Sequence, residues 1–221
     1  MESSTPAPTG DHADVRMLRI VHSTFRLETT RLVDASAKAE PSKLQPAIAP
    51  FWEFYAAVLH HHHHTEDAAT FPALVAQRPE FAGLVGTLVE DHKRLDSAMQ
   101  SADAAVAAFA EAPGAATQQT MHNSFVAVRD EFFPHLDVED EKILPAFAEF
   151  IPPAQWDEMD SKALKSIPRR YLSKAVAALD EVIQTVPEPD RPAGGPPLPL
   201  RVLLALSWRK KWVAFVAPLN V

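Results

Sequence analysis

The sequence predicts an all-α protein built on four long helices. In four segments the apolar residues recur at spacings of three, four, seven and eight, which is the periodicity of amphipathic helices. No strand-like alternation of useful length is present. Long segments with short connections favour an up-down-up-down four-helix bundle. At 221 residues, one core domain with an extension is expected.

Each of the four segments has one histidine on its apolar face, and these are His22, His62, His92 and His135. The apolar residues around them, segment by segment, are Leu18, Phe25 and Leu32; Phe54, Tyr55, Val58 and Leu59; Phe81, Leu84, Val85, Leu88, Val89, Leu95 and Met99; and Phe125, Val128, Phe132, Val138 and Ile143. The same face of each predicted helix therefore carries both apolar core residues and an imidazole.

Proline and glycine mark the predicted boundaries. Loops are expected at 41–50, 78–79 and 113–114. Pro134 directly precedes His135 inside the fourth segment, where it removes a backbone donor and should kink the helix without ending it.

Three regions are expected along the chain. Residues 1–13 should form a flexible N-terminal tail, 14–165 the four-helix bundle, and 166–221 a helical and proline-rich C-terminal extension. Two further helices are predicted at 155–164 and 171–183.

Composition excludes several classes of protein and site. The formal net charge of −8 argues against nucleic-acid binding, which needs a basic surface. The absence of cysteine leaves only nitrogen and oxygen ligands for a metal. The N-terminus lacks the features of a signal peptide, and the apolar stretch 202–216 is interrupted by Arg209, Lys210 and Lys211, so we expect a cytoplasmic protein without a transmembrane segment.

Six polar side chains are predicted to project into the bundle. A histidine is followed by a glutamate four residues later in two segments, and a spacing of four places both side chains on one helix face, about 6 Å apart. Burying carboxylates costs several kcal/mol each unless a charge or a metal compensates, and imidazole with bridging carboxylate suits a pair of irons. The six metal-ligand candidates are His22, His62, Glu66, His92, His135 and Glu139.

Each candidate also has a simpler explanation. A single histidine on an apolar face is more often a hydrogen-bonded core residue, but four on successive helices favour a shared metal site. Taken alone, the two glutamates could be charges at helix ends, and Asp67, Asp140 and Glu141 are predicted to be such surface charges.

Five consecutive histidines, at 60–64, precede Glu66, and such a run also resembles a weak surface metal patch. Only one or two of them can face the core of a helix. The phase of the apolar residues selects His62, with His61 or His63 near the edge of the site, and the two outer histidines are predicted to be solvated.

The order and spacing of these residues resemble the hemerythrin-like cation-binding (HHE) domain family over roughly residues 14 to 165. The resemblance is carried by His22; by His62-His63-His64-Thr65-Glu66-Asp67 with Phe71-Pro72-Ala73-Leu74; by Asp91-His92; and by His135-Leu136, Glu139-Asp140 and Leu144-Pro145. It implies the same six metal ligands and two iron ions joined by an oxo or hydroxo bridge.

Two positions depart from the oxygen-carrying hemerythrins. Those proteins place a second histidine four residues after the third-helix histidine, where this chain has Asp96, and this argues against a carrier role. They also place the fourth-helix carboxylate five residues after its histidine, which would select Asp140. We prefer Glu139 because its spacing from the histidine equals that in the second helix.

The sequence supports three functional hypotheses. The first is a non-haem diiron protein that binds or reduces a small oxidant, namely dioxygen, peroxide or nitric oxide. The second is a diiron enzyme that activates oxygen or decomposes peroxide. The third is an iron, oxygen or redox sensor acting through a partner, for which the stretch 198–218 offers basic residues among apolar ones. A ferritin-like site is excluded, because no histidine has a glutamate three residues before it.

Overall fold

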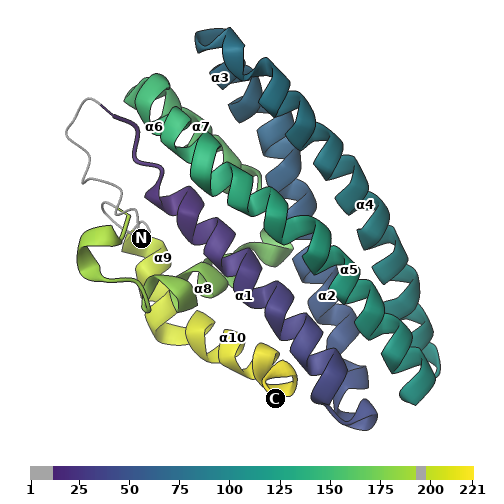
Figure 1. The fold of residues 1–221 in the computed structure, drawn as a ribbon. Coiled ribbons are helices and arrows are strands. Elements are labelled where there is room, and N and C mark those ends of the chain that lie inside the picture. Colours follow the sequence, from purple (N-terminus) through teal and green to yellow (C-terminus); the bar gives the residue numbers. More distant parts are fainter. Residues whose placement is uncertain (1–11, 193–197) are drawn as a thin grey trace.

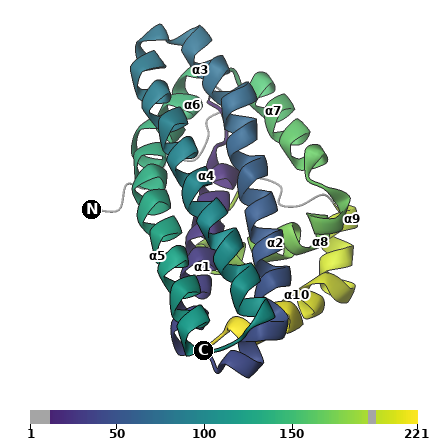
Figure 2. The same cartoon turned by 90° about the vertical axis from the view of Figure 1, so that its right-hand side faces the viewer.

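The computed structural model describes residues 12–192 and 198–221 and contains no strand within them, which confirms the all-α prediction. Four long helical units lie side by side (Figures 1 and 2). They are α1 (Arg16–Lys38); α2 (Pro41–Thr65), continued by a π turn (Glu66–Thr70) and α3 (Phe71–Gln77); α4 (Ala82–Glu111), entered through a 3₁₀ turn (Pro79–Phe81); and α5 (Ala115–Val138), continued by a π turn (Glu139–Ile143) and α6 (Leu144–Phe150).

The remaining helices form a second layer against the bundle (Figure 2). They are α7 (Pro153–Ser166), α8 (Arg169–Ile183), a 3₁₀ turn (Glu188–Asp190), α9 (Leu198–Leu203), a π turn (Leu204–Trp208), α10 (Arg209–Val216) and a 3₁₀ turn (Ala217–Leu219). The helices predicted at 155–164 and 171–183 are thus confirmed as α7 and α8. The predicted tail lies almost wholly outside the described residues.

The C-terminal segment docks onto α1 through a polar network. Arg31 of α1 donates hydrogen bonds to Glu181 of α8 at 2.9 Å and to Asn220 at 3.0 Å. The Trp212 indole also donates to Glu181, at 2.6 Å. Trp212 and Leu219 are both buried in the main apolar core, so this segment packs back onto the bundle.

The loop predicted at 41–50 is wrong, because α2 begins at Pro41. Pro41 takes the first helical position, where a missing N–H costs nothing. Pro46 and Pro50 are exposed, so the carbonyl groups that lose a helical partner there lie on the solvent face. Leu44 and Ile48 are fully buried and extend the apolar stripe of α2 by two turns.

The other boundaries agree with the sequence. Helices break at 78–79 and 113–114 as predicted. Helix α5 continues through Pro134, which is also exposed. None of the described helices has the length and apolar character needed to cross a bilayer.

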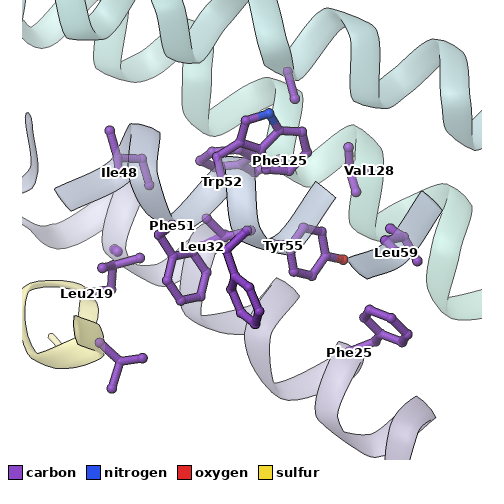
Figure 3. Packing of buried hydrophobic residues seen from close by; sticks show 14 of the residues in the cluster. Phe25, Leu32, Ile48, Phe51, Trp52, Tyr55, Leu59, Phe125, Val128 and Leu219 are labelled. Atoms are coloured by element: carbon purple, nitrogen blue, oxygen red, sulfur yellow. The ribbon is translucent and has the colours of Figure 1, made fainter. Parts of the chain in front are cut away.

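Two apolar clusters fill the interior, and polar side chains occupy the level between them. The larger cluster centres on α1, α2 and α5, with Trp52, Phe125 and their neighbours packed as Figure 3 shows. The smaller one gathers around α3, α6 and α7. Along α4, Leu88 belongs to the smaller cluster and Leu95 to the larger, and His92 lies between them. The bundle therefore places its candidate residues in a polar layer enclosed by apolar packing.

Candidate metal centre

The six side chains predicted from the sequence are all buried in this layer. Together with His63 they form two groups that could each hold a metal ion, and within each group the donor atoms lie within 4.8 Å of one another. The first group is His22, His62, Glu66 and Glu139, and the second is His63, Glu66, His92 and His135. Glu66 belongs to both groups, so the two sites are adjacent and share a carboxylate.

Both carboxylates lie between imidazoles of different helices. Glu66 Oε1 is 3.3 Å from His62 Nε2, and its Oε2 is 3.7 Å from His92 Nε2. Glu139 Oε2 is 3.3 Å from His135 Nε2 and 3.6 Å from His22 Nε2. Each carboxylate thus lies near one imidazole of its own helical unit and one of another helix.

A π turn begins at each of these glutamates. The N–H of Phe71 donates to the Glu66 carbonyl, and the N–H of Leu144 donates to the Glu139 carbonyl, five residues back in each case. A proline follows immediately at Pro72 and again at 145, and its ring clashes with an α-helical carbonyl four residues earlier. Each of these two π turns is thus followed by a proline, and π turns are frequent at functional sites.

His63 is the candidate residue that the sequence analysis did not select. It was expected near the edge of the site, but only 4% of its surface is exposed. Its ring stacks on that of His92 with a centroid separation of 4.1 Å, and both of its nitrogens are buried without a hydrogen-bond partner. The run of histidines was the available signal, because an apolar helix face is wide enough to admit two adjacent positions. His60 and His64 are exposed, as predicted.

Two aspartates orient histidine rings through hydrogen bonds. Asp140 Oδ1 is 2.8 Å from Nδ1 of His22, and Asp67 Oδ1 is 3.0 Å from Nδ1 of His92. Asp91 Oδ2 lies 3.7 Å from Nδ1 of His135, which is beyond hydrogen-bonding distance. An Nδ1–H donated to a carboxylate leaves Nε2 free as a metal donor.

Asp67 is exposed, as expected of a surface charge, but Asp67 and Asp140 each also contact a buried histidine. Each follows a candidate glutamate directly in the sequence, and that repeated Glu-Asp pair was the signal that could have identified them. Asp96, in contrast, joins neither donor group. Its half-exposed carboxylate lies 3.3 Å from Nδ1 of the exposed His60.

Burial and crowding change the proton affinities of the cluster. Burial lowers the pKa of His62 and of His63 well below the ordinary value, and the neighbouring imidazoles lower it further. Burial also raises the pKa of Glu66, with a smaller contribution from the charge of Glu139. Neutral imidazoles are the form that coordinates metal ions, so the environment of α2 favours ligation.

Many of the buried polar atoms in this layer have no hydrogen-bond partner. They include the Nε2 atoms of His22 and His62, both nitrogens of His63, Oε2 of Glu66, and both carboxylate oxygens of Glu139. Buried polar atoms are rarely left unpaired in folded proteins, and cations bound at the two donor groups would each engage one ligand atom from every residue of the group. The residues present thus fit a metal centre.

The family model described as the hemerythrin HHE cation binding domain matches residues 13–147. The chain belongs to this family. It is a metal-binding hemerythrin-like protein, and its matched region contains all seven residues of the two donor groups. No curated protein and no solved structure matched the chain. In this hemerythrin-like protein, α7 and all later helices lie beyond the matched region.

Proposed function

We propose that this chain is a non-haem diiron protein that binds or reduces a small oxidant: dioxygen, peroxide or nitric oxide. The observation that carries the proposal is the pair of donor groups that share Glu66. The proposed ligands are the six residues predicted from the sequence, His22, His62, Glu66, His92, His135 and Glu139, together with His63. Mixed imidazole and carboxylate donors suit iron, which supplies redox chemistry and an open coordination position when bound.

The two proposed positions differ in their donors. The second group offers three imidazoles and one carboxylate, whereas the first offers two imidazoles and two carboxylates. Helix α4 has no second histidine for this group, because the position four residues after His92 is Asp96. His63 of α2 supplies the third imidazole instead. Each group offers four protein donors, so an iron ion in either position would keep room for a further ligand.

Aromatic rings pack against three of the proposed histidine ligands. The ring centroid of Phe25 is 5.1 Å from that of His62, Phe71 stacks at 5.9 Å from His92, and Phe132 lies 6.2 Å from His135. An apolar wall favours small uncharged molecules such as dioxygen or nitric oxide over water and anions.

Metal analysis with optical spectroscopy tests this proposal. The purified or reconstituted protein should contain about two irons per chain, with near-ultraviolet absorption of a ferric pair. The spectrum of the reduced protein should change on addition of dioxygen, nitric oxide or peroxide. His62→Ala should remove these changes, and His64→Ala should preserve them because His64 is exposed. A protein that cannot be loaded with iron would contradict the proposal.

Steady-state peroxide consumption separates binding from catalysis. If the protein is an enzyme, consumption should continue over many turnovers and should stop in His62→Ala. If it only binds the oxidant, the spectral change should be stoichiometric with iron.

A further inference from the structure

A cavity of about 490 Å³ lies between the bundle helices α1 and α2 and the added helices α7 and α8. Figure 2 shows α7 and α8 beside α2. Because the family match ends at residue 147, one wall of this cavity is built from helices that the matched domain does not include. Its apolar lining includes Phe25, Phe54, Val58, Leu164, Val176 and Leu179.

The cavity reaches the proposed metal centre. His62 and Glu66 both contribute to its wall, as does Thr70 in the π turn after Glu66. The Thr70 hydroxyl and Oε1 of Glu28, another lining residue, are buried without a hydrogen-bond partner. A molecule in the cavity would therefore find unpaired polar atoms in an otherwise apolar wall.

Charge restricts what the cavity can accept. Among the lining residues that the structure describes, none is a lysine or an arginine. Asp157 and Asp160 of α7 are exposed lining residues, and they place negative charge where the cavity meets solvent. An anion such as a fatty acid would lose hydration there without gaining a cationic partner.

We propose that this cavity is a binding site for an apolar small molecule that carries a neutral hydrogen-bond donor or an amine, with its polar group held by Glu28 and Thr70. Its volume falls within the roughly 300–1,000 Å³ of small-molecule sites. A dry apolar cavity about a third as large takes up benzene, so this one offers a favourable environment for an apolar guest. The site does not depend on oxidant binding at the metal.

Probe displacement tests the chemistry of the site. The neutral dye N-phenyl-1-naphthylamine should bind the full-length protein with increased fluorescence. Octanol and octylamine should displace it about tenfold more strongly than octanoate, which has the same chain length and an anionic head. Asp157→Asn with Asp160→Asn should reduce this preference. Equal displacement by octanoate would overturn the proposal.

Filling the cavity tests its location. Leu179→Trp, whose side chain lines the cavity, should weaken dye binding about tenfold or more. Leu172→Trp is the matched control, because Leu172 is a partly buried residue of the same helix that does not line the cavity. Met159→Trp on α7 is an independent second block if the first variant does not fold.

Two outcomes would refute the assigned location. Unchanged dye binding in folded Leu179→Trp or Met159→Trp would show that the dye binds elsewhere. The second outcome concerns a variant that lacks residues 1–11. If this variant binds the dye more than about tenfold more tightly, the deleted segment, and not a small molecule, is the occupant of the cavity. Both measurements read dye fluorescence, so the outcome is separate from any result on iron or oxidants.

Discussion

Segments 62–72 and 135–145 use the same backbone design for the two carboxylates of the centre. Each has a histidine, a glutamate four residues later, an aspartate directly after it, a π turn, and a proline six residues after the glutamate. They differ at the second position, which is His63 in one and Leu136 in the other. Helix α2 therefore supplies imidazoles to both donor groups, whereas α5 supplies one to the second group alone.

The two glutamates also differ in proton affinity. Burial raises the pKa of Glu66 well above its ordinary value. Burial acts in the same direction on Glu139, but His135 and His22 outweigh it, and the pKa of Glu139 is lowered. The comparison teaches that one backbone motif leaves the two carboxylates with different proton affinities, because the charges around Glu139 outweigh its burial and those around Glu66 do not.

The largest effect should come from replacing each of these glutamates by glutamine. Glu66→Gln should reduce the iron content from about two ions per chain to less than about half an ion per chain, because Glu66 serves both groups. Glu139→Gln should retain about one iron in the group of three imidazoles. Metal analysis after reconstitution measures both, with the exposed Glu141→Gln as control. Equal losses in the two variants would show that the carboxylates are equivalent.

A smaller effect is expected when the second position is made alike in both segments. His63→Leu gives α2 the apolar residue that α5 has at Leu136, and it removes one of three imidazoles from the second group. The iron content should fall from about two to about one per chain, while the exposed His64→Leu keeps both. Two irons retained in His63→Leu would remove His63 from the ligand set.

Much of the fold followed from periodicity. Four apolar stripes predicted the four long helices because a buried helix face repeats its apolar residues at a fixed interval. The exception was 41–50, where prolines outweighed the pattern of Leu44 and Ile48 in the prediction. Proline disrupts a helix through its missing N–H and its ring, and on a solvent-facing side the carbonyl groups it frees can bind water. Whether a proline faces solvent or the core becomes clear only when the apolar periodicity of the helix is continued past that proline.

The site was predictable where a single helical phase determined it. A spacing of four brought His62 and Glu66 together, and the structure places both in one donor group. His63 was missed because the buried face of α2 is wide enough for two adjacent histidines, whereas the prediction selected one. Asp67 was missed because it lies in the π turn, where it is exposed and still reaches His92.

The smallest effect should distinguish the two aspartates that orient the rings. Asp140 lies 2.8 Å from His22 and also accepts a hydrogen bond from Arg26 at 3.1 Å, whereas Asp67 lies 3.0 Å from His92 and has the more exposed side chain. Loss of such a partner typically weakens metal affinity by about 10- to 100-fold. Asp140→Asn should therefore approach the upper end of this range and Asp67→Asn the lower, in competition with a chelator of known affinity. The exposed Asp137→Asn should leave affinity unchanged, since Asp137 contacts Arg26 and not a histidine. A stronger effect of Asp67→Asn would show that solvent exposure does not weaken the ring-orienting contact.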